Sequence, residues 1–189
     1  MFILHQLKKF QSNGDDGHLV RVSLEQACDK FLVEFIVEKK GLDPWHILKS
    51  TSCDHYGNWG LWEGDVVEVF IQGREDAEAL LAPYLELNVS PNGHRFALVV
   101  QKPRQTFYTP IQLDFKSVVC HTTHDGGELW KTSINFDLPE QIKGKLFINF
   151  NCCLKCSGET EYYGLNLANT GKADFHRPEV FLPLCDIVL

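Results

Sequence analysis

Apolar and polar residues alternate with a period of two along much of this 189-residue chain. In the segment 30–40, Phe31, Val33 and Phe35 fall on one face, whereas Glu34 falls on the other. Such alternation is typical of β-strands with one buried face. It predicts about ten strands, at residues 18–24, 30–40, 65–72, 84–90, 95–101, 111–123, 128–138, 145–154, 161–167 and 179–189.

Turn-forming residues separate these predicted strands, namely Asn13-Gly14, Asp16-Gly17, Pro91-Asn92-Gly93, Asp125-Gly126-Gly127 and Ser157-Gly158. Residues 74–81 form the best helix candidate, and residues 139–143 predict one more helical turn. Many short strands with almost no helix indicate an all-β fold, an antiparallel β-sandwich with jelly-roll or immunoglobulin-like layers. A chain of this length predicts a single domain spanning residues 1–189.

Composition narrows the classes of partner. The chain carries 25 acidic and 18 basic residues, for a net charge of −7. Nucleic acids and anionic membrane surfaces both require a basic surface, so the charge argues against both partners. The sequence has no apolar run of ~20 residues and no signal-peptide pattern at its start, which predicts a cytoplasmic location or a chain that has lost its leader. The seven cysteines are odd in number, and we expect reduced thiols.

Acidic and aromatic residues are interleaved between residues 60 and 93. Glu68 shares a strand face with large apolar residues, which favours a structural role for its carboxyl group. On the next strand, Glu86 and Asn88 lie on a continuous hydrogen-bonding face. Saccharide sites combine flat aromatic faces with carboxylates and amides that bind hydroxyl groups. The candidate binding residues are therefore Trp59, Trp62, Glu63, Glu86, Asn88, Trp130, Asn149, Asn151 and His176.

No catalytic motif accompanies these residues. The sequence contains no Gly-x-Ser-x-Gly, no phosphate-binding loop and no Gly-x-Gly-x-x-Gly. Glu68 and Glu86 would support glycoside hydrolysis only across a cleft that holds one of them protonated. We therefore expect a protein that is not an enzyme.

Two groups of cysteine and histidine residues are candidate metal ligands. Cys152-Cys153-x-x-Cys156 lacks the second cysteine pair of a zinc site, and strand alternation points Cys152 and Cys153 to opposite faces. Cys120-His121-x-x-His124 would bind a metal only if it met Cys53-x-His55. No metal ligand is assigned, although a metal- or redox-linked binding domain stays open as an alternative.

Several motifs resemble one known group of proteins. They are Leu61-Trp62-Glu63-x-Asp65-x-x-Glu68-x-Phe70, Tyr84-Leu85-Glu86-x-Asn88-x-Ser90-Pro91-x-Gly93, Trp130-x-x-x-Ile134, Leu146-x-Ile148-Asn149-Phe150-Asn151 and Asp174-Phe175-His176-x-Pro178-Glu179-x-Phe181. Together they resemble the DOMON-like sandwiches related to family 9 carbohydrate-binding modules, in particular the bacterial DOMON-like proteins. The matching motifs extend from about residue 60 to residue 184.

This resemblance implies a non-catalytic carbohydrate-binding β-sandwich. In its sugar-binding members two tryptophans enclose a terminal sugar and calcium ions bind structurally, so calcium is the cofactor that the resemblance implies. Trp62 belongs to the shared signature, and Trp59 and Trp130 are the other candidate platforms. A haem-binding branch uses a methionine and a histidine, but Met1 is the only methionine here. A structural or interaction domain without a sugar ligand is the remaining alternative.

Overall fold

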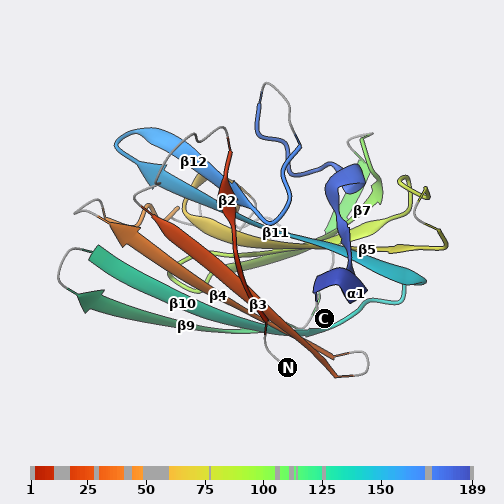
Figure 1. Cartoon of the computed structure of the whole chain (residues 1–189), viewed down its shortest axis with the longest axis horizontal. Helices are drawn as coiled ribbons and strands as arrows, with labels where there is room; N and C mark the ends of the chain where they lie inside the picture. Colours follow the sequence, from red (N-terminus) through yellow and green to blue (C-terminus); the bar gives the residue numbers. More distant parts are fainter. Residues whose placement is uncertain are drawn as a thin grey trace.

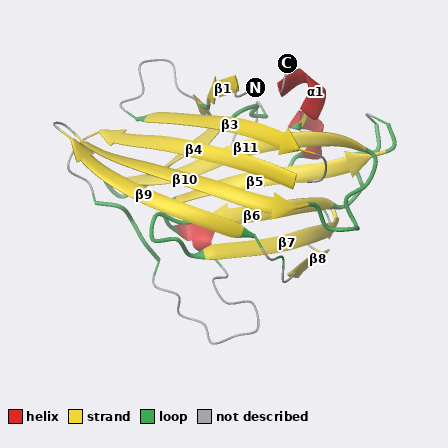
Figure 2. Cartoon of the chain, turned by 90° about the horizontal axis from the view of Figure 1, so that it is seen from below, coloured by secondary structure: helices red, strands yellow, loops and turns green. Residues whose placement is uncertain are grey.

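In the computed structural model, residues 3–10, 18–27, 30–40, 44–48, 60–76, 78–104, 107–110, 113, 115–124, 127–168 and 172–187 are described. Their strands form two antiparallel sheets that stack as a β-sandwich, as predicted (Figures 1 and 2). The five-stranded sheet has the order β1 (Ile3–Gln6), β3 (Leu19–Ala27), β4 (Lys30–Lys40), β10 (Gly127–Asp137) and β9 (Lys116–His124).

The eight-stranded sheet carries the elements that matter for the site. Its order is β2 (Lys8–Lys9), β12 (Glu159–Gly164), β11 (Lys145–Cys156), β5 (Val66–Arg74), β6 (Tyr84–Val89), β7 (Arg95–Lys102) and β8 (Phe107–Pro110), and β13 (Leu182–Pro183) pairs with β11. The helical elements in the described part of the chain are short: two 3-10 turns, η1 (Leu61–Glu63) and η2 (Pro178–Val180), and one helix, α1 (Leu184–Ile187).

The main hydrophobic core lies between the sheets. Alternation sends Phe31, Val33 and Phe35 of β4 inward, where they meet the inward side chains of β11. Phe35 contacts Phe150 edge-on, with the ring centroids 5.9 Å apart. The apolar face predicted from the sequence is thus the face that joins the two sheets.

A second apolar cluster covers the outer face of the eight-stranded sheet. It includes Leu61, Phe70 and Tyr84 together with Phe175 and Phe181, which belong to the C-terminal segment that follows β12 (residues 172–181). In Figure 1 this segment, drawn in blue after β12, stands over that sheet. Every residue of β5 and β6 is consequently buried, on both faces of the sheet. Polar side chains on this outer face therefore lie in the interior of the protein.

Two sequence predictions about secondary structure are wrong. No described residue of 74–81 is helical, and β5 instead continues to Arg74. The side chain of Asp76 accepts a hydrogen bond from the backbone N–H of Glu78 at 2.9 Å, and Gln72 Nε2 donates to the carbonyl of Leu80 at 3.2 Å. These side-chain bonds replace helical backbone pairing. Residues 139–143 form a turn, closed by the Ile142 N–H and the Pro139 carbonyl.

The C-terminal prediction also differs from the structure. Residues 179–189 were expected to form one strand, but the described part holds η2, the two-residue β13 and α1. Pro178 starts η2 at a position where the missing N–H costs nothing. The predicted Ser157-Gly158 turn is confirmed, because both residues have positive φ angles (49° and 88°), as a tight hairpin turn between β11 and β12 requires.

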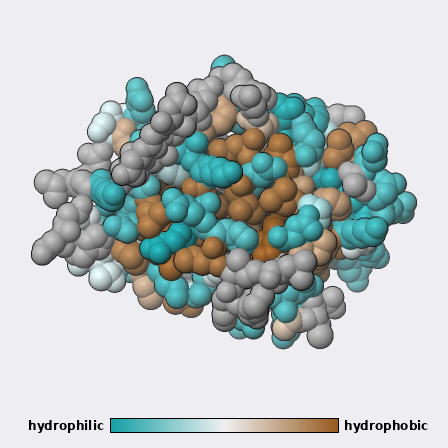
Figure 3. Space-filling view, viewed as in Figure 1, coloured by the Kyte–Doolittle hydropathy of each residue, from teal (hydrophilic) through white to brown (hydrophobic). Residues whose placement is uncertain are grey.

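The surface shows apolar and hydrophilic areas. Figure 3 shows brown, apolar side chains near the centre of the view and teal, hydrophilic ones around them. None of the described helices is long and apolar enough to cross a membrane.

Candidate functional site

A pocket of about 620 Å³ opens on the outer face of the eight-stranded sheet. Its walls come from the sheet, from η1 and from the C-terminal segment. The lining residues are Trp62, Glu68, Tyr84, Glu86, Leu98, Val100, Arg104, Cys153, Tyr162, Ala173, Asp174, Phe175 and His176. The volume lies within the ~300–1,000 Å³ typical of small-molecule sites.

Two glutamates form the floor of this pocket. The register of β5 and β6 places Glu68 opposite Asn88 and Phe70 opposite Glu86. Glu68 and Glu86 are therefore diagonal neighbours on one face, with side-chain bases roughly 7 Å apart. Both residues are almost fully buried, at 3% and 2% exposure. A single ligand group can therefore reach both carboxyl groups.

Burial and mutual repulsion favour the protonated form of this pair. The pKa of Glu68 is raised well above its ordinary value, first by desolvation and then by the charge of Glu86. Desolvation also raises the pKa of Glu86, although His176 and a hydrogen bond from Asn88 oppose the rise. Ionising both carboxyl groups at this separation costs electrostatic free energy, because the two negative charges repel each other. Both carboxyl groups therefore hold their protons to higher pH than exposed glutamates do.

Unpartnered polar atoms surround the glutamates. The register aligns Asn151 of β11, Glu68 of β5 and Asn88 of β6 in one row across the sheet. Asn88 Nδ2 donates to Glu86 Oε1 at 2.8 Å, but Asn88 Oδ1, Glu86 Oε2 and both side-chain polar atoms of Asn151 have no hydrogen-bond partner. A buried polar atom without a partner costs about 1–3 kcal/mol, which a ligand or water can recover.

Aromatic side chains supply apolar walls. Trp62 of η1 is half-buried and lies 6.4 Å from Phe96, centroid to centroid. Tyr162 of β12 meets Phe175 edge-on at 5.8 Å. The pocket therefore combines flat apolar surfaces with buried hydrogen-bonding groups.

The rim is held by polar contacts between β6, the end of β7 and the C-terminal segment. The hydroxyl of Tyr84 is hydrogen-bonded to His176 Nδ1 at 2.7 Å. Arg104 pairs with Asp174 at 2.7 Å and also donates to the His176 carbonyl at 3.3 Å. These contacts fix the C-terminal segment over the sheet and close one side of the pocket.

The structure brings together part of the predicted binding set. Trp62, Glu86 and His176 line the pocket, and Asn88 and Asn151 lie in the polar row beneath it. Glu63 is exposed and is not among the lining residues. Trp59 lies outside the described residues.

Trp130 and Asn149 require correction. Trp130 is fully buried in the core between the sheets, on the far side of the eight-stranded sheet from the pocket, and packs edge-on against Trp45 at 5.7 Å. It cannot act as an exposed sugar platform. The amide of Asn149 is engaged by the chain itself, because its Nδ2 donates to the Asn166 carbonyl at 3.0 Å and its Oδ1 accepts from the Phe150 and Asn166 N–H groups. Asn149 therefore secures the chain after β12.

Sequence reasoning missed several lining residues. Glu68 was assigned a structural role because apolar residues share its face, yet that face is the pocket side of the sheet. The alternation in β6 could have indicated the role of Glu68, because Glu86 lies on the polar face of that neighbouring strand and also lines the pocket. Asp174 belongs to one of the sequence motifs, but nothing in the sequence pairs it with Arg104, because only the fold brings these two segments together.

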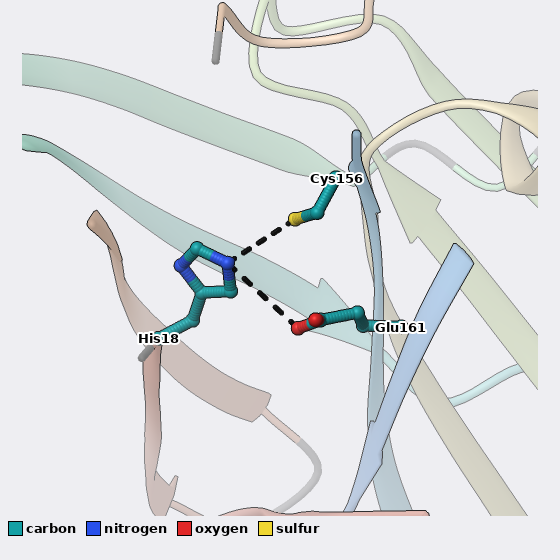
Figure 4. A group of neighbouring side chains, drawn as sticks. All are labelled: His18, Cys156 and Glu161. Carbon is teal, nitrogen blue, oxygen red and sulfur yellow. Dashed lines mark hydrogen bonds and ion pairs between the residues drawn. The ribbon is translucent and has the colours of Figure 1, made fainter. Parts of the chain in front are cut away.

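One group of side chains outside the pocket has the spacing of metal ligands. Among the described residues, His18, Cys156 and Glu161 have ligand atoms within 4.8 Å of one another. Figure 4 shows the His18 imidazole reaching toward both partners, with Nε2 3.2 Å from Cys156 Sγ and 3.8 Å from a Glu161 oxygen.

The proton arrangement of this group does not fit a metal ion. The backbone N–H of Lys40 donates to His18 Nδ1 at 3.0 Å, so the proton of the neutral ring sits on Nε2 and points at the sulfur and carboxylate. A metal on Nε2 requires the opposite tautomer, with Nδ1–H donating to an acceptor. Lys9 and the hydroxyl of Tyr163 already bind the carboxylate of Glu161, at 2.9 Å and 2.6 Å. The group is a hydrogen-bond cluster that ties β12 and β11 to β2, β4 and the start of β3.

Calcium does not fit this group either, because calcium takes six to eight oxygen ligands and the three side chains offer one carboxylate.

The described residues of the other cysteine and histidine motifs do not come together as metal ligands. Cys152 packs in the core between the sheets, whereas Cys153 lines the pocket, as strand alternation predicted. His121 Nε2 contacts the Pro91 carbonyl at 2.7 Å, while Cys53 and His55 lie outside the described residues.

Comparison with solved structures places the fold among carbohydrate-binding proteins. A Bacteroides uniformis protein provisionally described as carbohydrate-binding matches with a TM-score of 0.70 and 13% identity, over 96% of this chain and 84% of that one. A family 9 carbohydrate-binding module from Caldicellulosiruptor kristjanssonii, in complex with cellotriose, matches with a TM-score of 0.56 and 14% identity, over 96% and 80%. The module in complex with glucose gives a TM-score of 0.51 and 15% identity, over 89% and 76%.

At these identities the likeness establishes the fold and leaves the ligand open. The chain has a β-sandwich fold like that of family 9 carbohydrate-binding modules. No protein-family model matches the sequence. A search of curated proteins likewise gave no significant match.

Proposed function

We propose that the protein binds a saccharide without transforming it, in the pocket on the outer face of the eight-stranded sheet. The observation that carries this proposal is the combination of aromatic walls, Trp62, Tyr162 and Phe175, with the buried carboxyl groups of Glu68 and Glu86. Aromatic faces pack against the C–H side of a sugar ring, and carboxyl groups bind its hydroxyls. Solved structures with this fold include modules in complex with cellotriose and with glucose.

The unpartnered atoms beneath the pocket support the same function. Glu86 Oε2, Asn88 Oδ1 and the amide of Asn151 together offer donors and acceptors that no protein group uses. A saccharide presents several hydroxyl groups, each able to donate and accept. The finer assignment to the DOMON-like proteins rests on the sequence motifs and remains a prediction.

The test is calorimetric titration with a panel of mono- and disaccharides, comparing the wild-type protein with Trp62→Ala. Trp62 lines the pocket, and its loss should weaken binding at least about tenfold, as removal of a stacking residue does. Glu63→Ala is the matched control, since the neighbouring residue is exposed and outside the lining. Absence of binding to every saccharide at millimolar concentration would contradict the proposal and favour an interaction domain without a sugar ligand.

A further inference from the structure

The buried glutamate pair lacks a fixed cation. Among the described residues, no lysine or arginine side chain forms an ion pair with Glu68 or Glu86, and the charged group that most affects Glu68 is Glu86 itself. Burying a carboxylate is favourable only when an opposite charge or several hydrogen bonds accompany it. The pocket therefore holds excess negative charge whenever the pair is fully ionised.

The basic side chains at the rim, Arg104 and His176, are engaged in other contacts. Arg104 is bound to Asp174 at 2.7 Å, so their charges cancel. The Nδ1 atom of His176 lies 3.8 Å from Glu86 Oε2, but it is already hydrogen-bonded to the Tyr84 hydroxyl at 2.7 Å, and its side chain is 56% exposed. Neither residue is a buried counterion for the pair.

The pocket otherwise resembles a site for an ammonium group. Two carboxyl groups on adjacent strands can receive one ammonium between them, and Glu86 Oε2 is an acceptor without a partner. Aromatic walls add attraction for a cation through their π faces. The remaining titratable side chains that line the pocket are Tyr84, whose pKa burial raises, Tyr162, and Cys153, whose pKa burial also raises, so that Tyr84 and Cys153 stay neutral near pH 7.

We infer that the ligand of this pocket is a saccharide with a free primary amino group, bound with its ammonium between Glu68 and Glu86. The inference rests on the proposed saccharide function and specifies the class of sugar. A neutral sugar leaves the buried carboxyl pair without a counterion, whereas an ammonium supplies the missing positive charge. A uronic acid would add a further negative charge and is disfavoured.

The proton balance of binding follows from this arrangement. The raised pKa values favour a proton on the pair in the free protein. When an ammonium enters between the two glutamates, both become carboxylates that accept N–H bonds, and a proton held by the pair passes to the buffer. Binding of an amino sugar as its ammonium thus favours proton release, whereas a neutral sugar leaves the proton on the pair.

The experiment compares three β-1,4-linked disaccharides by calorimetry at about pH 6, where the free amino groups are already ammonium ions: the dimer of glucosamine, cellobiose and the dimer of N-acetylglucosamine. We expect the glucosamine dimer to bind wild-type protein at least about tenfold more tightly than cellobiose, as a charge-assisted hydrogen bond in place of a neutral one predicts. Titration in buffers with different ionisation enthalpies should show proton release for the glucosamine dimer only. Acetylation removes the ammonium and should abolish the preference.

Variants locate the preference. Glu68→Gln and Glu86→Gln keep the side-chain shape. In each variant the affinities for the glucosamine dimer and for cellobiose should become about equal. Circular dichroism checks their folding, and the wild-type ligand series tests the inference even where a variant does not fold. Cellobiose binding equal to or tighter than that of the glucosamine dimer would overturn this inference and leave the proposed function intact. Binding of no saccharide would overturn both.

Discussion

The ammonium of Lys39 and the carboxylate of Asp65 lie 3.3 Å apart in the interior, with side-chain exposures of 1% and 0%. Lys39 Nζ also donates to the carbonyls of Pro44 and Lys155, at 3.1 Å and 2.8 Å. Asp65 accepts N–H bonds from His46 at 2.8 Å and Lys155 at 2.6 Å. One buried pair thus joins β4 of one sheet to β11 of the other and holds residues 44–46 between them.

Replacing Lys39 tests this junction. Lys39→Met leaves a buried carboxylate and two carbonyls without their cation, and should lower the free energy of unfolding by about 3–5 kcal/mol. Urea denaturation measures the change. Lys39→Met/Asp65→Asn should lose less than the sum of the two single changes, because the residues are coupled.

The matched control is Lys131→Met. Lys131 pairs with Glu34 at 3.0 Å on the surface and is 44% exposed, so its loss should cost less than about 1 kcal/mol. Equal effects of Lys39→Met and Lys131→Met would show that the buried pair has no special role.

Trp130→Ala should act on stability and leave binding intact. The side chain fills the core against Trp45, and its removal should cost about 3–5 kcal/mol. Saccharide affinity measured well below the unfolding temperature should stay within about twofold of wild type, because the residue lies on the other side of the sheet from the pocket. Loss of binding with unchanged stability would contradict the placement of Trp130.

The free energy of unfolding should decrease as the pH rises, because of the buried carboxyl group of Glu68. Since its pKa is raised in the folded protein, the folded state keeps a proton that the unfolded chain loses above its ordinary pKa of 4.5. The free energy of unfolding therefore falls as the pH rises from 4.5 through the raised pKa. Glu68→Gln removes this loss, so thermal unfolding from pH 4 to 8 should show a flatter profile and equal or greater stability at pH 7.

Glu34 is a control, because its effect on stability should depend on pH in the opposite direction to that of Glu68. A hydrogen bond from Ser133 is the main cause that lowers its pKa in the folded protein. Its contribution is present above the ordinary value of 4.5 and is lost as the pH falls through the lowered pKa. Glu34→Gln should therefore lower stability near neutral pH. A steeper pH dependence in Glu68→Gln than in wild type would contradict the assignment for Glu68.

Metal ions should leave the described clusters unchanged. The tautomer of His18 and the single carboxylate of its group argue against zinc and calcium there. The difference in unfolding midpoint between wild type and Cys156→Ser should therefore be the same with a chelator, with calcium or with zinc. A zinc-dependent rise in the midpoint that Cys156→Ser removes would show that His18 adopts the other tautomer and binds the metal.

Alternation along the chain was enough to predict both strand faces. Phe31, Val33 and Phe35 point to the core, as predicted. Cys152 and Cys153 lie on opposite faces of their strand, which was also predicted. The prediction did not extend to residues 74–81, because the side-chain bonds of Gln72 and Asp76 that prevent a helix depend on local geometry. It also did not reach the short β1, β2 and β8, which are too brief for a periodic signal.

By itself the sequence determined that the chain is a β-sandwich and that Glu86 and Asn88 share one face, because a period of two fixes side-chain direction within a strand. Only the tertiary structure decided that this face is covered by the C-terminal segment and is therefore buried. This burial makes Glu68 part of the pocket floor. Stacking of the two sheets, in contrast, places Trp130 in the core between them and therefore outside the site. Pairing between distant strands and the path of loops decide such matters, and neither is encoded in local periodicity.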